Sequence, residues 1–196
     1  MKYSKVILAS GSPRRKELLT WAGVPFEIMI SDIDETPLKG EPPADMVRRL
    51  SAEKAVAVAL QAKLNDVIII AADTTVVSPK GKILGKPTDL KDAFKMISEL
   101  QGKTHQVLTG YALVKIKKGK IQRTISKVVS TAVTMRALTI TERNFYLSQG
   151  ESMDKAGAYA AQGFGMVLIE KIRGSYTNVV GLPMNEVLQH LVKLSD

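Results

Sequence analysis

Short apolar runs alternate with amphipathic segments along the first half of the chain. Val6–Ala9 is apolar, and after a polar turn the segment Lys16–Ala22 is amphipathic and stops at Gly23. Such a succession is typical of a strand, a tight turn and a helix. Ser12 suits the N-cap, Pro13 the first helical position and Gly23 the position after the last turn. The pattern therefore predicts a strand that leads directly into a helix.

A second apolar run, which ends at Ala72, is continuous and rich in β-branched residues. It is typical of a strand buried on both faces, and it closes on Asp73. Similar patterns predict strands at 25–30, 107–114, 122–135 and 166–172, a hairpin over 76–84, and helices over 44–64, 89–100, 141–150 and 184–194, with Thr141 as a cap.

The order of these elements indicates the fold class. Strands and helices alternate at first, and a long antiparallel pair then intervenes, which favours an α/β fold around a mixed sheet. A chain of 196 residues can bury a substantial core. We expect a single domain over residues 1–196, in which two lobes can share one sheet.

The amino-acid composition limits which catalytic groups and metal ligands the protein can use. The chain has no cysteine, and its two histidines, His105 and His190, lie far apart in the sequence. Thiolate chemistry is excluded, and a Ser–His–Asp triad is disfavoured. A bound metal would be a hard, oxygen-liganded ion such as Mg²⁺ or Mn²⁺. The first apolar run is too short for a signal peptide, and no stretch approaches a membrane span, so we expect a cytoplasmic protein without a membrane partner.

The net charge of +9 is compatible with nucleic acid, an anionic membrane or a phosphorylated small substrate as a ligand. The basic residues are dispersed, however, and the densest group, Lys115–Lys120, is typical of a solvated hairpin tip. Aromatic residues for base stacking are sparse, and no helix-turn-helix or RNA-binding signature is present. We therefore expect no stable nucleic-acid partner.

Two arginines, Arg14 and Arg15, fall in the first turn of the first predicted helix, just after Ser10-Gly11-Ser12. A cation at that end of a helix is unfavourable by roughly 0.3–1 kcal/mol. The arrangement is favourable if an anion docks there, because free N–H groups and two guanidinium groups suit a polyphosphate. A surface helix that merely begins with arginines is the alternative.

Carboxylates follow two of the predicted strands. Asp73 comes where ligands bind in open α/β sheets, so it could hold a metal or act as a general base. A turn cap with Thr74 or Thr75 is the alternative. Asp32, Asp34 and Glu35 form an acidic loop, which fits either a metal site or a solvated loop.

Two lysines are candidates for contact with an anion. At 100° per residue, Lys54 falls inside the apolar arc of the helix over 44–64, so it must extend to solvent or meet an anion such as phosphate. Lys86 lies in a stiff turn between Gly85 and Pro87. The arc is formed by Met46, Val47, Leu50, Ala57, Val58, Leu60 and Leu64.

Two later segments could form a polar rim. Residues 154–163 combine small residues with polar ones, and the amide of Gln162 suits the edge of a base. Residues 174–183 lead into the last helix, where a structural loop fits equally well.

Together these segments resemble the Maf family of nucleoside triphosphate pyrophosphatases, in that family's order from end to end. The resemblance implies a metal-dependent hydrolase of phosphoric anhydride bonds, which cleaves a nucleoside triphosphate to the monophosphate and pyrophosphate. It also implies an elongated mixed sheet flanked by helices, of the kind shared with inosine triphosphatases, with two lobes and a central cleft. The matching segments are 8–19, 51–55, 71–77, 83–87, 102–110, 154–163 and 174–183.

The resemblance also assigns roles to individual residues. Asp73 matches the general base, and Glu35 matches a residue that helps to hold the metal, Mg²⁺ or Mn²⁺, together with Asp73. The water that Asp73 activates would attack the α-phosphorus. The phosphate contacts would come from Ser10, Arg14, Arg15, Lys54 and Lys86.

The base preference is implied by three positions. Arg14, Thr74 and Gln162 match a subgroup that acts on dTTP and UTP, whereas the subgroup favouring 7-methyl-GTP has Trp and Glu in place of Arg14 and Gln162. A preference for a modified nucleotide or 7-methyl-GTP, and a non-catalytic role in septum formation during cell division, are the alternatives. A homodimer is compatible with the sequence.

Overall fold

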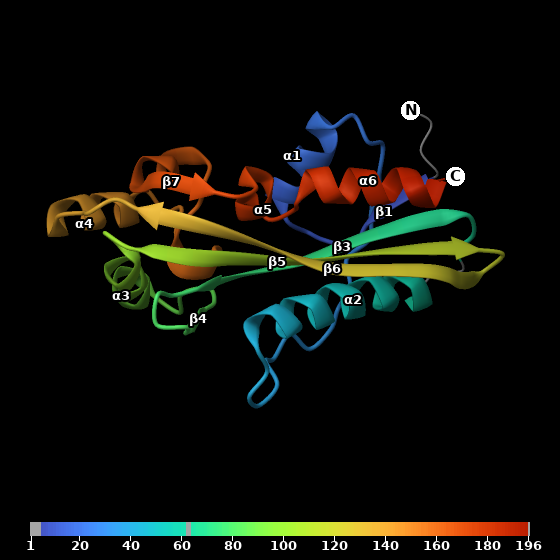
Figure 1. Cartoon of the computed structure of the whole chain (residues 1–196), viewed down its shortest axis with the longest axis horizontal. Helices are drawn as coiled ribbons and strands as arrows, with labels where there is room; N and C mark the ends of the chain where they lie inside the picture. The colour runs from blue at the N-terminus through green and yellow to red at the C-terminus, as the bar shows by residue number, and fades with distance from the viewer. Residues whose placement is uncertain (1–4, 62–63, 196) are drawn as a thin grey trace. The chain divides into compact units, whose positions relative to one another are not determined.

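A computed structural model describes residues 5–61 and 64–195 of the chain (Figure 1). The described residues divide into two compact units. The first takes its residues from Met1–Asp73, Thr109–Val129 and Gly181–Asp196, and the second from Thr74–Leu108 and Ser130–Val180. Three of the four boundaries fall inside long strands, and the fourth falls between residues 180 and 181.

Seven strands form one mixed sheet within the described residues, in the order β2-β1-β3-β5-β6-β7, with β4 paired to β3. β1 is parallel to both β2 and β3, whereas β4 and β7 are antiparallel to their partners. The predicted fold class, α/β with a mixed sheet, is confirmed. The strands are β1 (Lys5–Leu8), β2 (Glu27–Ile28), β3 (Val67–Val77), β4 (Ile83–Leu84), β5 (Thr104–Lys117), β6 (Lys120–Met135) and β7 (Ile169–Arg173).

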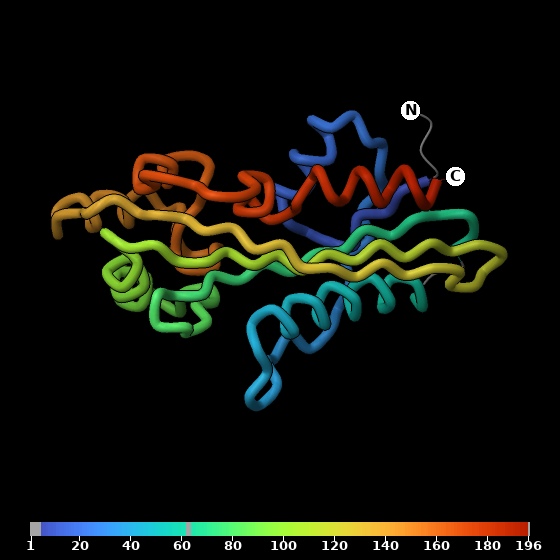
Figure 2. Tube along the Cα trace, viewed as in Figure 1, coloured from blue at the N-terminus to red at the C-terminus, as the bar shows by residue number. Residues whose placement is uncertain are grey.

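β5 and β6 run side by side as a long hairpin (Figure 2). Lys118 and Gly119 form its turn, both with positive φ, 51° and 71°. The turn lies where the sequence predicts it. The positive φ values are expected, because a two-residue hairpin loop needs left-handed backbone. Both strands are longer than predicted.

Six α-helices are found in the described part of the chain, at or near the predicted positions except for one. The exception is a short helix, α5, inside the segment 174–183, for which the sequence left a polar rim and a structural loop as alternatives. The helices are α1 (Pro13–Trp21), α2 (Pro43–Gln61), α3 (Leu90–Leu100), α4 (Ile140–Ser148), α5 (Tyr176–Val180) and α6 (Met184–Ser195), with 3₁₀ turns η1 (Ala156–Ala158) and η2 (Gly163–Leu168).

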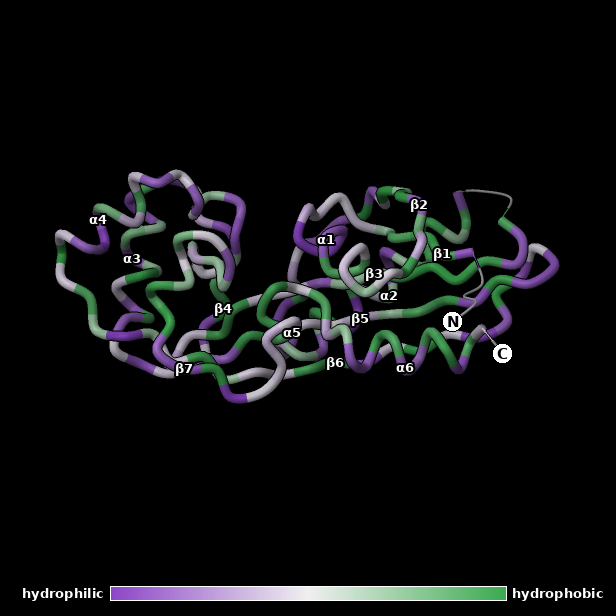
Figure 3. The backbone as a smooth tube through the Cα atoms, turned by 90° about the horizontal axis from the view of Figure 1, so that it is seen from above, coloured by the Kyte–Doolittle hydropathy of each residue, from purple (hydrophilic) through white to green (hydrophobic). Residues whose placement is uncertain are grey.

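In the first unit, helices cover both faces of the sheet, with α2 on one side and α1 and α6 on the other (Figure 1). α2 approaches β5 closely, because a Cβ at Gly110 would overlap the carbonyl of Val47. Ala55 and Val58 of α2 are fully buried against alternate residues of β3 and β5. In Figure 3, α6 alternates between hydrophobic and hydrophilic positions, as expected of a helix that covers a sheet.

The inward face of α2 differs from the predicted apolar arc most clearly at Leu60, and Leu64 lies beyond the end of the helix. Leu60 is 78% exposed, although the arc predicted from the sequence includes it. It lies two residues, or about 200°, from the buried Val58, which puts it on the opposite face of the helix. Lys54, by contrast, is buried as predicted, with 8% exposure.

The core of the second unit lies among α3, α4, η1 and the strands of that unit. Ile97 and Leu100 of α3 pack with Val133 and Met135 of β6 and with Tyr146 of α4. The side chains in this cluster are almost completely buried. This unit therefore has a hydrophobic core of its own.

The starts of one helix and one strand differ from the prediction in an informative way. The N-cap of α4 is Thr139, not Thr141: its hydroxyl accepts from the Glu142 N–H, and the Glu142 carboxylate accepts from the Thr139 N–H. β7 begins at Ile169, not Met166, because the preceding residues form a 3₁₀ turn. Within the described residues, no helix has both the length and the apolar character that a membrane span requires.

Candidate active site

The turn between β1 and α1 places a buried serine against a half-buried arginine. Nη1 of Arg15 donates to Oγ of Ser10 at 3.0 Å, and the Ser12 N–H donates to the same oxygen at 3.3 Å. Nε of Arg15 donates to the carbonyl of Gly181 at 2.8 Å. The guanidinium group is therefore held between the first turn of α1 and the segment just before α6.

The N-terminus of α1 is cationic. Arg14 and Arg15 occupy its first turn, which has no acidic residue, and Ser12 is the N-cap but makes no side-chain capping bond. Burial lowers the pKa of Arg15, and attraction by the Asp73 carboxylate opposes that shift. Arg15 therefore lies within electrostatic range of the carboxylate that the sequence singled out.

Asp73 lies inside strand β3 and does not close it, contrary to the prediction from the apolar run. The parallel pairing of β3 with β1 stops at Ile70, and β3 then continues to Val77, where β4 pairs with it. Asp73 thus follows the end of the parallel pairing while its backbone remains extended.

Lys54 is the central side chain of the candidate site. Its Nζ lies 2.7 Å from Oδ1 of Asp73 and 3.1 Å from Oε1 of Glu35. The side chains of Lys54 and Asp73 are almost buried, whereas that of Glu35 is 60% exposed. The anion that the inward-facing lysine meets in this structure is thus a pair of carboxylates.

The acidic loop is anchored to α2 by Arg49. This guanidinium group makes a bidentate ion pair with Glu41, at 2.7 and 2.8 Å, and donates to the Thr36 carbonyl. Hydrogen bonds from Thr36 lower the pKa of Asp34, whose carboxylate is thereby engaged within the loop. Glu35, the loop residue between Asp34 and Thr36, is the one that reaches Lys54.

A hard divalent cation fits this arrangement as a two-carboxylate site. Glu35 and Asp73 converge on one point, and carboxylate oxygens are the donors that Mg²⁺ and Mn²⁺ prefer. No group of three or more acidic or histidine side chains suited to a metal is found in residues 5–61 and 64–195. Such an ion would therefore keep water or substrate oxygens as its other ligands, as Mg²⁺ commonly does.

The remaining predicted site residues belong to the second unit. Thr74 follows Asp73 in β3 and is half-buried. Lys86 is exposed in the loop between β4 and α3, and Gln162 is half-buried just before η2. The structure thus brings together Ser10 with Arg15, and Glu35 with Lys54 and Asp73.

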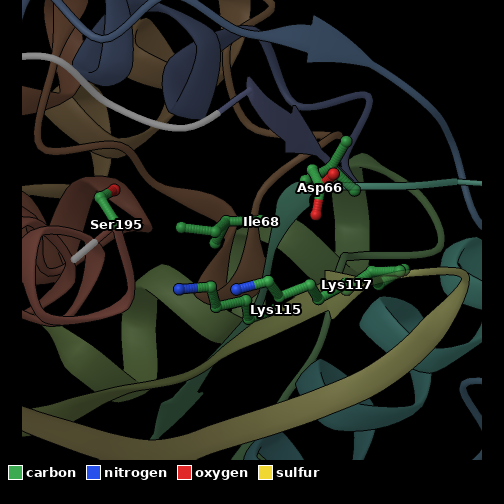
Figure 4. A pocket seen from close by; sticks show the side chains of 7 residues that line it. Asp66, Ile68, Lys115, Lys117 and Ser195 are labelled. Atoms are coloured by element: carbon green, nitrogen blue, oxygen red, sulfur yellow. The ribbon is translucent and has the colours of Figure 1, made fainter.

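A pocket of about 180 Å³ lies elsewhere in the first unit (Figure 4). Figure 4 shows the side chains of Lys115 and Lys117 alongside one another, with Ile68 above them and Asp66 and Ser195 at the sides. None of the predicted site residues lines this pocket. It is distinct from the candidate site.

Sequence reasoning missed two residues that hold the site together. Arg49 fixes the acidic loop, and Gly181 accepts from Arg15. The sequence places Arg49 on the outward face of its helix, and nothing else in the sequence marks it as a residue of the site. Gly181 lies in the segment 174–183, a possible polar rim in the sequence, but nothing in that segment indicates an arginine partner.

Fold and charged cluster together define an α/β protein with a candidate anion site next to two carboxylates. The chain belongs to the Maf family, since the model of the family described as "Maf-like protein" matches residues 5–194.

Named relatives agree with this assignment. The chain is 45% identical to a dTTP/UTP pyrophosphatase of Geobacter sulfurreducens, over 99% of this chain and 98% of the relative. It is 47% identical to one of Syntrophus aciditrophicus, over 97% and 90% of the two chains. A dTTP/UTP pyrophosphatase of Bacillus thuringiensis subsp. konkukian is 44% identical, over 95% and 94%.

Among solved structures, a nucleoside-triphosphatase (dITP/XTP pyrophosphatase) of Mycobacterium abscessus is similar with a TM-score of 0.42. Its sequence is 13% identical, and the match covers 95% of this chain and 93% of that one.

Proposed function

We propose that this protein is a nucleoside triphosphate pyrophosphatase that hydrolyses dTTP and UTP to the monophosphate and pyrophosphate. The observation that carries the proposal is the contact of the nearly buried Lys54 with Asp73 and Glu35, in the same unit as the paired arginines of α1. Near full-length similarity to dTTP/UTP pyrophosphatases supports the same reaction.

The cationic residues would bind the triphosphate. Arg15 is already oriented by Ser10 and Gly181, so that it loses little freedom on binding phosphate. Arg14, Lys54 and Lys86 would add further positive charge. Positioning and charge stabilisation are the main means by which proteins accelerate phosphoryl chemistry.

Asp73 would act as the general base. Its carboxylate would take a proton from a water molecule whose oxygen attacks the α-phosphorus, and the bond from that phosphorus to the bridging oxygen would break as pyrophosphate leaves. Glu35 and Asp73 are the residues that would hold a divalent cation. When bound, such an ion neutralises charge on the phosphate oxygens.

The base preference would rest on Arg14, Thr74 and Gln162, which match the dTTP/UTP subgroup. The Gln162 amide offers both a donor and an acceptor, as the edge of uracil or thymine requires. A Glu at this position would have only acceptors when ionised, and would suit a base that presents donors. We therefore propose a preference for pyrimidines over 7-methyl-GTP.

The products test this proposal. Purified protein is incubated with dTTP, UTP and 7-methyl-GTP, each with Mg²⁺ or Mn²⁺, and the products are separated by ion-exchange chromatography. Monophosphate and pyrophosphate in equal amounts, formed selectively from dTTP and UTP, would support it. Diphosphate with orthophosphate, or no turnover by folded protein, would refute the reaction, and turnover of 7-methyl-GTP alone would refute the specificity.

A further inference from the structure

One ammonium group lies where the two candidate metal-binding carboxylates meet. Nζ of Lys54 is 2.7 Å from Asp73 and 3.1 Å from Glu35, and the lysine is only 8% exposed. The positive charge therefore stabilises two carboxylates that would otherwise repel each other at close range.

A divalent cation held by Glu35 and Asp73 would compete with this ammonium group. Both would be attracted by the same two carboxylates, and two positive charges at that point would repel each other strongly in a poorly hydrated environment. A cation can therefore bind these carboxylates well only if Lys54 moves away from them.

A bound triphosphate would offer the Lys54 ammonium group new hydrogen-bond acceptors. A lysine has a flexible four-carbon stem and three N–H donors, and its ammonium can exchange one oxygen partner for another. Without a triphosphate, leaving the carboxylates would take a nearly buried charge away from its partners, which is costly. Phosphate oxygens would provide replacement partners.

We infer that Lys54 couples the binding of the divalent cation to the binding of the nucleotide. In the nucleotide-free protein Lys54 competes with the cation for Asp73 and Glu35. Bound triphosphate attracts Lys54 and leaves both carboxylates to the cation. This inference rests on the proposed function, since it takes a triphosphate as the second ligand.

Coupling of this kind is reciprocal. If the nucleotide strengthens cation binding by some factor through Lys54, the cation strengthens nucleotide binding by the same factor. Couplings between sites are commonly about 5- to 150-fold. The protein would thus bind cation and nucleotide together in preference to either alone.

The test measures Mn²⁺ affinity directly, by electron paramagnetic resonance of free Mn²⁺, in the wild type and in Lys54→Gln. Without nucleotide, we expect the variant to bind Mn²⁺ at least about fivefold more tightly, the lower end of such couplings. The titration is repeated with a saturating α,β-imido analogue of UTP, which is not cleaved. The gain in affinity that the analogue causes should be at least about fivefold smaller in the variant.

A matched control and an alternative variant sharpen the comparison. Chelation of Mn²⁺ by the phosphates of the analogue is common to both proteins and cancels in the ratio. Lys5→Gln removes another lysine of the same unit from an ion pair, 2.9 Å from Glu27, and should leave Mn²⁺ binding unchanged. Lys54→Met keeps the apolar stem, and replaces Lys54→Gln if circular dichroism shows that the latter is unfolded.

Equal Mn²⁺ affinities of the wild type and the folded Lys54 variant, in the absence of nucleotide, would overturn the inference. So would an equal gain from the analogue in both proteins. Failure of the analogue to bind either protein would instead count against the proposed function, because the nucleotide-free comparison does not depend on it.

Discussion

At the scale of single residues, Asp73 combines extended backbone with a nearly buried carboxylate. Its exposure is 9%, and Lys54 lies 2.7 Å away. A group held in this way loses little freedom when a water molecule is positioned against it. This is what a general base requires.

Asp73→Asn should lower kcat for dTTP and UTP by about 10²–10⁴-fold, because the amide cannot take the proton from water. Steady-state kinetics with pyrophosphate detection would measure this. Asp66→Asn is the matched control, since Asp66 is exposed just before the same strand and has positive φ, which Asn tolerates. A folded Asp73→Asn protein with normal kcat would contradict the assignment.

Gly181 has φ of 126° and gives its carbonyl to Nε of Arg15. Gly181→Ala should displace that carbonyl, because residues with a side chain rarely adopt this backbone. We expect KM for UTP to rise roughly tenfold with a smaller change in kcat, as for the loss of one charge-assisted hydrogen bond that orients a binding group.

Gly81→Ala is the control for backbone strain, because Gly81 also has positive φ and a Cβ added there would meet no atom within 4 Å. Both variants should lose stability, but only Gly181→Ala should change KM. Equal KM values in the two folded variants would show that Gly181 does not position Arg15.

At the scale of elements, periodicity was a good guide wherever one face of an element is buried. α2, α3, α6 and the hairpin of β5 and β6 all follow their hydrophobic patterns. The extension of β3 beyond Ala72 was not predictable, because Asp73 and the two threonines after it are typical of a turn. In the structure that segment remains extended as part of β3, which pairs with β4 at Val76 and Val77.

The site was predictable to a similar degree. Lys54 was found because a lysine inside an apolar arc needs an anionic partner, but its contact with Glu35 depends on how Arg49 anchors a loop. Glu35 and Lys54 lie on different segments, so no hydrophobic periodicity in the sequence predicts that they meet. The contact between Gly181 and Arg15 could not be predicted for the same reason, since the two residues are 166 positions apart in the sequence.

The capping box of α4 allows a direct test of the corrected boundary. Thr139→Ala should lower the free energy of unfolding by about 0.5–2 kcal/mol, because the Glu142 N–H loses its acceptor. Thr141→Ala, at the exposed position first expected to be the cap, should have an effect within about 0.5 kcal/mol. Urea denaturation measures both, and equal losses would contradict the assignment.

β5 also contributes a buried titratable group, His105, whose Nε2 lies 2.6 Å from the Tyr159 hydroxyl. Burial lowers the pKa of His105 to about 4. The unfolded chain, with a pKa near the usual value of about 6.5, binds the proton more readily, so this group stabilises the fold above about pH 6.5. That contribution is lost as the pH falls from about 6.5 to about 4.

His105→Gln removes the titration and should make stability less dependent on pH in that window. The wild type should lose up to about 3 kcal/mol more than the variant between about pH 7 and pH 4, from a shift of this size. Urea denaturation at both pH values gives the difference, in which the other titrating groups cancel. The same loss in both proteins would show that His105 titrates normally.

At the scale of the whole molecule, the net charge of +9 suits a polyanionic substrate. The structure places part of this charge at specific points, at the start of α1 and at Lys54, next to the two carboxylates. The membership in the Maf family and the similarity to dTTP/UTP pyrophosphatases are consistent with the same chemistry.

The central claim is attack of water at the α-phosphorus, and isotope labelling tests it most directly. Hydrolysis of UTP in H₂¹⁸O, followed by mass spectrometry of the separated products, shows which phosphorus the water attacked. The account predicts one ¹⁸O atom in UMP and none in pyrophosphate. Label in pyrophosphate, or in orthophosphate released with UDP, would contradict it.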